Sequence, residues 1–120
     1  MDRLKHRADF LRAARGVRRV MPAVTLEATT TPEKFAEAGA IRVGFTATRK
    51  IGGAVQRNRA KRRLRAAAAA LLPLYGRRGH DYVLVARAET LSAPFARILA
   101  DLAAALEAAH VRLAKTESPS

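Results

Sequence analysis

Residues 41–65 read IRVGFTATRKIGGAVQRNRAKRRLR, and this stretch carries a strand pattern followed by a helix pattern. Residues 40–48 alternate between apolar and more polar side chains, which is typical of a strand with one buried face. The glycine pair at 52–53 then predicts a turn. Beyond it come strong helix formers without an internal glycine or proline, so we expect a helix over residues 55–72, ended by Pro73.

Working outward, the same criteria predict the remaining elements. They are a helix at 3–15, a strand at 23–29, a loop at 30–39, a strand at 81–87 and a long helix from Ser92 to about 114. The strands at 41–48 and 81–87 enclose a helix, so we expect them to be parallel, whereas the first two strands are expected to form an antiparallel pair. Residues 81–87 are apolar on both faces, which favours a central position.

These elements predict an α+β fold, a single-domain α/β sandwich in the order α-β-β-α-β-α with a mixed sheet. A chain of 120 residues suits one domain, here 1–115. The tail at 116–120 is polar and contains a proline, so we expect it to be disordered. Trp is absent and aromatic residues are few, so the core is expected to consist of Leu, Val and Ile.

Positive charge dominates the composition. The chain has 23 Lys and Arg against 10 Asp and Glu, which gives a formal net charge of +13. A small soluble domain does not need such an excess for solubility, and a polyanionic partner would relieve its self-repulsion. Nucleic acid is therefore the first candidate partner, and an anionic membrane surface is the second. The absence of cysteine excludes disulfides and zinc-finger sites, and it fits a reducing cytoplasm.

The charge is concentrated at residues 49–65, which contain eight basic residues and no acid. On a helical projection, one side of the predicted helix is apolar and the rest is cationic. The apolar side consists of Ala60, Leu64, Ala67 and Leu71. A solvated helix face normally mixes both signs at i,i+4 spacing, so we interpret this surface as a polyanion-binding ridge.

Some side chains have two readings. Asn58 either contacts a base edge or a ribose hydroxyl, or caps the start of the helix. Phe10 either stacks on a base or belongs to the core side of the first helix. A second basic group spans residues 3–19, and a cleft between the first helix and the sheet would suit an extended nucleic-acid strand, with Thr46 and Thr48 supplying hydroxyls.

Enzyme motifs are not found. There is no strand–GxxxxGK[ST]–helix unit, and the histidines at 6, 80 and 110 are scattered, so we expect each of them at the surface. Asp81 is expected to be a turn residue rather than a base. A self-sufficient nuclease would need several carboxylates to hold metal ions, and the sequence does not assemble such a set.

The stretch 41–65, with Arg57-Asn58-Arg59 followed by Lys61-Arg62 and Arg65, resembles the signature of the protein subunit of bacterial ribonuclease P. The resemblance continues through 81–87 and reaches back to Arg3-Leu4-Lys5 and Phe10. It implies a ribosomal-protein-like fold with a left-handed βαβ crossover, although handedness rules alone predict a right-handed one. One departure is that many members carry a second aromatic residue about one turn after Phe10, where this chain has Ala13 and Ala14.

The resemblance also implies a function. The chain would be the protein subunit, without an active site of its own, of a ribonucleoprotein endoribonuclease that removes the 5′ leader from precursor tRNA. Magnesium ions held by the catalytic RNA would perform the hydrolysis, and none would be bound by the protein alone. Contacts with the catalytic RNA are implied for Arg57, Asn58, Arg59, Lys61, Arg62 and Arg65. Contacts with the single-stranded leader are implied for Phe10, Thr46, Thr48, Arg49 and Lys50.

Other functions remain as alternatives. A ribosomal or RNA-chaperone protein would bind RNA without stimulating its cleavage. A DNA-binding protein would be expected to have fewer uninterrupted arginines on its recognition helix and a dimer interface, whereas we expect a monomer within the ribonucleoprotein. A membrane-surface helix would expose bulky apolar residues, but the 55–72 helix offers mainly alanines. An organelle transit peptide is disfavoured by Asp2, Asp9 and the lack of serine near the N-terminus.

Overall fold

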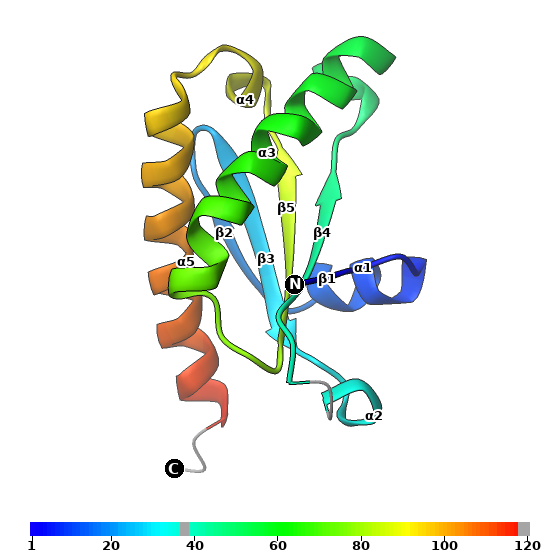
Figure 1. The fold of residues 1–120 in the computed structure, drawn as a ribbon, viewed down its shortest axis with the longest axis vertical. Helices are drawn as coiled ribbons and strands as arrows, with labels where there is room; N and C mark the ends of the chain where they lie inside the picture. The colour runs from blue at the N-terminus through cyan, green and yellow to red at the C-terminus, as the bar shows by residue number, and fades with distance from the viewer. Residues whose placement is uncertain (37–38, 118–120) are drawn as a thin grey trace.

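The computed structural model describes residues 1–36 and 39–117, and Figure 1 shows how its elements follow one another. The strands are β1 (Asp2–Arg3), β2 (Val17–Val20), β3 (Val24–Thr30), β4 (Arg42–Thr46) and β5 (His80–Ala86). The helices are α1 (Arg7–Ala14), α2 (Glu33–Ala36), α3 (Ala54–Tyr75), α4 (Ala88–Ser92) and α5 (Phe95–Glu117), with a 3-10 turn η1 (Arg49–Ile51) before α3.

The strands form one mixed sheet in the order β1-β4-β5-β3-β2. The parallel pairing of β4 with β5 is confirmed, with Val43 opposite Tyr82 and Phe45 opposite Leu84. The central position predicted for residues 81–87 is confirmed as well, because β5 lies between β4 and β3. The predicted antiparallel pairing of the first two strands is wrong, because both β3 and β4 pair with β5 instead of with each other.

The strand β2 was missed in the sequence, and it explains part of this error. Its four residues, Val17 to Val20, include two adjacent arginines, so they show no simple apolar alternation. β2 and β3 form an antiparallel pair in which Arg19 lies opposite Leu26. This hairpin gives β3 a partner on its outer side, and β5 supplies the partner on its inner side.

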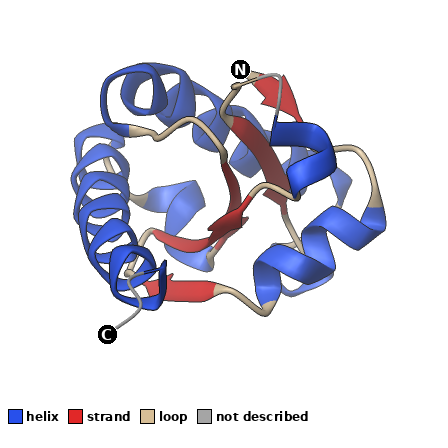
Figure 2. Cartoon of the chain, turned by 90° about the horizontal axis from the view of Figure 1, so that it is seen from below, coloured by secondary structure: helices blue, strands red, loops and turns tan. Residues whose placement is uncertain are grey.

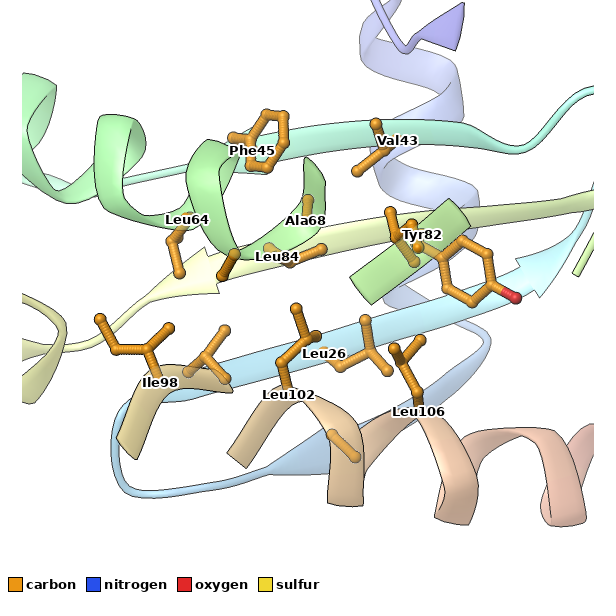
Figure 3. Close-up of a cluster of buried hydrophobic side chains, with 14 of the residues drawn as sticks. Leu26, Val43, Phe45, Leu64, Ala68, Tyr82, Leu84, Ile98, Leu102 and Leu106 are labelled. Atoms are coloured by element: carbon orange, nitrogen blue, oxygen red, sulfur yellow. The ribbon is translucent and has the colours of Figure 1, made fainter. Parts of the chain in front are cut away.

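Helices lie on both sides of the sheet, as Figure 2 shows. α3 and α5 pack on one face and cover the main core, which includes Leu26, Leu84 and Leu102 (Figure 3). α1 packs on the other face against β3 and β5. Small residues on α3 and α5, such as the fully buried Ala67 and Ala105, allow the two helices to lie close to the sheet and to each other.

The connection from β4 through α3 to β5 is left-handed, as the resemblance implied. In Figure 1 both strands run upward, α3 descends in front of the sheet, and β5 lies to the left of β4. Right-handed crossovers are the strong general rule for parallel strands, so this connection is one of its exceptions.

Several element boundaries differ from the predicted ones. α3 continues past Pro73 to Tyr75, since a proline in the last turn removes only one hydrogen bond at an exposed helix end. The predicted loop at 30–39 contains the short helix α2, and α4 precedes the long C-terminal helix. α5 extends through Glu117, so the helix reaches into the predicted tail, whose residues 118–120 lie outside the described residues.

His110 is buried, contrary to the expected surface position, whereas His6 is exposed as expected. The Tyr82 hydroxyl accepts a hydrogen bond from the backbone N–H of Arg77 at 2.9 Å. The same hydroxyl is hydrogen-bonded to Nε2 of His110, 2.6 Å away. Burial, with a smaller contribution from the charges of Arg77 and His80, lowers the pKa of His110 to about 4.

We expect His110 to make the stability of the protein pH-dependent. In the unfolded chain it takes up a proton below about 6.5, but in the folded protein only near 4, so stability falls as the pH falls through this interval. Urea unfolding at pH 7.5 and 4.5 should show a larger loss for the wild type than for His110→Gln. His6→Gln, which changes an exposed histidine, should behave like the wild type; equal losses in all three proteins would contradict the assignment.

Candidate nucleic-acid interface

The helix α3 presents a cationic face to solvent, as its sequence predicted. Ala60, Leu64 and Ala67 are fully buried against the sheet, and Leu71 is partly buried beside them. The polar side chains on the remaining circumference form a surface that we call the arginine ridge: Arg57, Asn58, Arg59, Lys61, Arg62 and Arg65. Asn58, Arg59 and Arg62 are exposed and the other three are half-buried.

No acidic side chain in the described part of the chain compensates the charges of the arginine ridge. The ion pairs among the described residues involve Arg12, Arg18 and Arg42, and none involves α3. Like charges at this spacing weaken an isolated helix, so the buried apolar side must hold α3 in place. The ridge is therefore a preformed polycation whose counterions a polyanion can displace.

Arg63 differs from the other arginines of α3. Its two terminal nitrogens donate to the carbonyl oxygens of Thr90 and Ala93, each at 2.6 Å. These carbonyls belong to α4 and to the residue after it, so Arg63 fixes the connection that leads into α5. Its role is structural, and only the fold reveals this, because the sequence places it among five similar residues.

The start of α3 is shaped by a glycine. Gly52 has φ 138°, a conformation that other residues rarely adopt, and a Cβ there would lie 2.9 Å from Cβ of Gln56. The guanidinium of Arg57 donates to the carbonyl oxygen of Gly52 at 3.2 Å. This tight turn brings Arg49 and Lys50, both exposed on η1, next to the first turn of the arginine ridge.

Asn58 does not cap the helix. α3 begins at Ala54, with Gly53 at the capping position, so Asn58 lies at its fifth residue. The capping interpretation is therefore wrong, and the exposed amide is free to meet a partner on the ridge.

Phe10 lies on the face of the sheet opposite to α3. It packs partly buried beside Leu4, Ala13 and Val83. Its ring covers the backbone of Gly44, where a Cβ would come within 2.6 Å of Cζ of the ring. Phe10 therefore belongs to a small core under α1, as one interpretation predicted. Part of its ring stays exposed, so it also remains a candidate for stacking on a base.

The open side of β4 leads from Phe10 toward the arginine ridge. Gly44, Thr46 and Thr48 alternate onto this side, and Arg49 and Lys50 follow directly. Thr46 is half-buried and Thr48 is exposed. We call Phe10, Thr46, Thr48, Arg49 and Lys50 the open-face row; an extended strand that follows it would meet an aromatic ring, two hydroxyls and two cations.

Arg87 joins this surface and was not assigned from the sequence. It follows β5, and its guanidinium donates to the Thr25 hydroxyl at 3.4 Å, on the side of the sheet away from α3. The carboxyl ends of parallel strands lie at the same end of a sheet, so Arg87, after β5, lies at the same end as Thr48, after β4. The sequence does indicate this position, because Arg87 is a basic residue at the carboxyl end of a predicted parallel strand.

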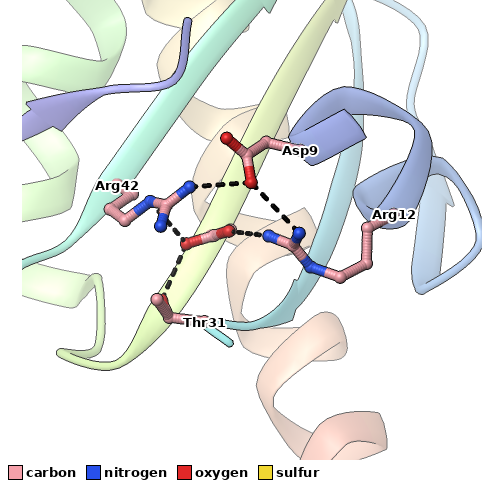
Figure 4. Close-up of polar contacts among 5 residues, drawn as sticks. Asp9, Arg12, Thr31 and Arg42 are labelled. Atoms are coloured by element: carbon pink, nitrogen blue, oxygen red, sulfur yellow. Dashed lines mark hydrogen bonds and ion pairs between the residues drawn. The ribbon is translucent and has the colours of Figure 1, made fainter. Parts of the chain in front are cut away.

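The residue beneath this face is Asp81, a fully buried carboxylate in β5 (Figure 4). It accepts hydrogen bonds from Arg12 on α1 and, at 2.7 Å, from the Thr31 hydroxyl, and it forms an ion pair with Arg42 at 3.3 Å. Asp9 completes the cluster, with Oδ1 lying 3.0 Å from Arg12 and 2.9 Å from Arg42. We call these five residues the carboxylate network.

The carboxylate network corrects two expectations. Asp81 is not a turn residue, because it lies within the central strand, where its charge needs partners. Arg12 belongs to the predicted second basic group, yet it is neutralised here and is not available to a polyanion. Burial alone would raise the pKa of Asp9, but the hydrogen bonds and charges of Arg12 and Arg42 outweigh this and lower it. Both carboxylates thus serve to dock α1, and with it Phe10, on the sheet.

Within residues 1–36 and 39–117, no three His, Asp or Glu side chains gather where they could hold a metal ion. Asp9 and Asp81 do converge, but guanidinium groups occupy the positions where a cation would bind. In the same part of the chain, no helix is both long and apolar enough to span a membrane.

Comparison with known proteins adds to this geometry. The family model described as Ribonuclease P matches residues 1–110. The chain is 46% identical over 108 residues to the ribonuclease P protein component of Paramagnetospirillum magneticum, covering 89% of this chain and 81% of that protein. It is 49% identical over 108 residues to the corresponding protein of Ruegeria pomeroyi, covering 89% and 85%.

Solved structures agree on the fold. The RNase P protein of Staphylococcus aureus superimposes with a TM-score of 0.72 at 23% identity, covering 91% of this chain and 95% of that one. The RNase P protein of Thermotoga maritima also gives a TM-score of 0.72 at 23% identity, covering 90% and 97%. The α+β architecture is therefore shared despite extensive sequence change.

We expect Asp81→Asn to destabilise the protein by about 3 kcal/mol, because Arg12 and Arg42, both partly buried, would be left with one carboxylate for two charges. Urea unfolding at neutral pH measures this. Asp2→Asn removes the same charge at an exposed position and should change stability by less than about 0.5 kcal/mol. Similar unfolding midpoints for the two variants would show that the network does not hold α1 in place.

Proposed function

The chain belongs to the ribonuclease P protein family, and from this premise we propose how its surfaces divide the work of that enzyme. The family supplies the protein subunit of the ribonucleoprotein endoribonuclease that matures the 5′ end of tRNA, and association with an RNA subunit follows from membership. The arginine ridge would bind the catalytic RNA, and the open-face row would hold the 5′ leader of precursor tRNA.

The assignment of the arginine ridge to the catalytic RNA rests on charge and rigidity. Arg59 and Arg62 are exposed and unpaired with any carboxylate of the described residues, so they can form bidentate contacts with phosphates. The ridge lies on a helix whose other side is buried in the core, so little conformational entropy is lost on binding. The amide of Asn58, exposed among these cations, suits a ribose hydroxyl or a base edge.

The assignment of the open-face row to the leader rests on shape and chemical variety. A single RNA strand has exposed bases and 2′-hydroxyls, which aromatic rings and threonine hydroxyls recognise. Phe10 offers part of its ring, Thr46 and Thr48 offer hydroxyls, and Arg49 with Lys50 would neutralise phosphates near the arginine ridge. Ala14 is exposed one turn after Phe10, so stacking would depend on one ring.

Catalysis would belong to the RNA. Magnesium ions bound by the RNA subunit would activate the attacking water and stabilise the charge that develops on the scissile phosphate. The protein would bind and orient the substrate, and its cationic surface would lower the repulsion between two RNA molecules. We also propose that the protein acts as a monomer within the ribonucleoprotein, in the cytoplasm.

The observation that carries this proposal is the uncompensated arginine ridge, directly followed in space by the mixed surface of the open-face row. A general RNA-binding protein needs only the first of these. A protein that presents a substrate to a catalytic RNA needs both, because one surface must face the RNA subunit and the other must face the leader.

Cleavage of precursor tRNA by a bacterial ribonuclease P RNA at low magnesium, with and without this protein, tests the function. We expect cleavage to be stimulated, because the protein's positive charge substitutes for part of the screening by magnesium. The protein alone should cleave nothing. Tight RNA binding without stimulation would instead identify a general RNA-binding protein.

The arginine ridge is tested by Arg59→Ala. We expect affinity for the RNA subunit to fall roughly tenfold, and the slope of log K against log salt, roughly −3 to −5 in the wild type for about five phosphate contacts, to become shallower by about one. Alanine is an even better helix former than arginine, so the fold should persist. Arg78→Ala, at an exposed turn far from α3's first turns, is the matched control. A flat salt dependence of the wild type, or unchanged affinity of Arg59→Ala, would contradict the proposal.

A further inference from the structure

A basic hollow lies at the free edge of β2, outside both surfaces described above. Its volume is about 580 Å³. It is bounded by the end of α1, by β2, by the end of β3 and by the last turns of α5. We call it the edge hollow, and its polar lining consists of Arg15, Arg18, Arg19, Arg112, Thr29 and Thr30.

The described lining of the edge hollow is strongly cationic. Of the described residues that line it, four are arginines and none is acidic. Arg18 reaches Glu27 only at 3.9 Å, with 59% of the arginine side chain exposed, so this ion pair is weak. The four charges come from three separate elements, and the fold holds them together although Arg112 is far from the others in sequence.

Arg19 carries the most specific signal. Its Nε is buried and has no hydrogen-bond partner among the described residues. A buried donor without an acceptor costs about 1–3 kcal/mol. Arg19 lines the hollow, so a shift of its side chain toward a group bound there would give Nε an acceptor and recover this cost.

We infer that the edge hollow binds the phosphodiester backbone of an RNA strand, at a place separate from the arginine ridge and the open-face row. Phosphate oxygens satisfy guanidinium groups in pairs, and a sugar-phosphate chain can pass several arginines in succession. The Thr29 and Thr30 hydroxyls add donors for the same oxygens. This inference rests on the proposed function, since it requires an RNA partner to be present.

The position of the hollow separates it from the other contacts. In Figure 1, η1 and the start of α3 lie at the upper end of the molecule, whereas the start of β2 and the end of α5 lie at the lower end. The molecule extends 42 Å along this axis. The RNA bound at the edge hollow is thus a different segment from the one on the first turns of α3: either a distal part of the leader or a second region of the RNA subunit.

The double variant Arg19→Gln/Arg112→Gln tests the inference, with Arg78→Gln as the matched control because it removes an exposed charge outside the hollow. Two affinities are measured with the full chain: that of the protein for the RNA subunit alone, and that of the reconstituted enzyme for precursor tRNA with a short or a long leader. For the double variant we expect at least one of these affinities to fall by about fivefold or more. The slope of log K against log salt for that affinity should become shallower by about one to two.

The pattern of loss identifies the source of the phosphates. A loss confined to long-leader substrates assigns the hollow to the distal leader, and a loss in binding the RNA subunit assigns it to that RNA. Unchanged affinities in both assays, or an equal loss in Arg78→Gln, would overturn the inference. Because Arg19 is partly buried, the single variant Arg112→Gln, at an exposed position, is measured as well and should show a loss of the same kind.

The outcome is distinguishable from a failure of the proposed function. If the wild-type protein does not stimulate cleavage, the proposed function fails whatever the variants do. If the wild type stimulates cleavage and the hollow variants bind both RNAs as well as it does, only the edge hollow is refuted.

Discussion

The buried carboxylate of Asp81 imposes a constraint on which the side of the sheet that carries α1 and Phe10 depends. A charge inside the central strand requires partners, and the fold supplies Arg12 from α1, Arg42 from β4 and the Thr31 hydroxyl. Satisfying Asp81 therefore docks α1 across the sheet and sets the position of Phe10 over Gly44. The same cluster pairs two arginines with carboxylates, so it separates the cations that hold the fold together from those that remain for a partner.

Charge compensation distinguishes the arginines of this chain better than their exposure does. Arg12 and Arg42 meet carboxylates, and Arg63 meets two backbone carbonyls at the connection into α5. Arg59, Arg62 and the other cations of the ridge meet no acid among the residues that the structure describes. A protein with a net charge of +13 can keep so many unpaired cations in one place only because the core holds α3 against their repulsion. The core thus offsets the repulsion within a surface that a polyanion would neutralise.

The two faces of the sheet differ: one packs on the main core and the other carries the open-face row. The alternation of side chains along each strand separates the residues of the two faces. On β4, Val43 and Phe45 enter the core beneath α3, while Gly44 and Thr46 face the opposite side. Gly44 has no side chain, so the ring of Phe10 can lie directly on the backbone. The open-face row therefore begins at a ring that the fold holds in place and ends at two exposed cations beside the ridge. A substrate strand along this row would lie close to the RNA subunit without competing for the same arginines.

The sequence by itself determined the local features. Alternation gave the faces of β4, the two-sided apolar pattern gave the central position of residues 81–87, and the 3.6-residue period separated the buried from the cationic side of α3. These features depend on neighbours within a few residues. The handedness of the crossover came from resemblance alone. Only the tertiary structure decided which strands pair with β3 and that His110 and Asp81 are buried. It also decided that Arg63 has a structural role and that Arg112 and Arg19 line the same hollow. Each of these features depends on residues that are distant in the sequence. Such contacts arise when separate elements pack on one core, and no local pattern encodes them.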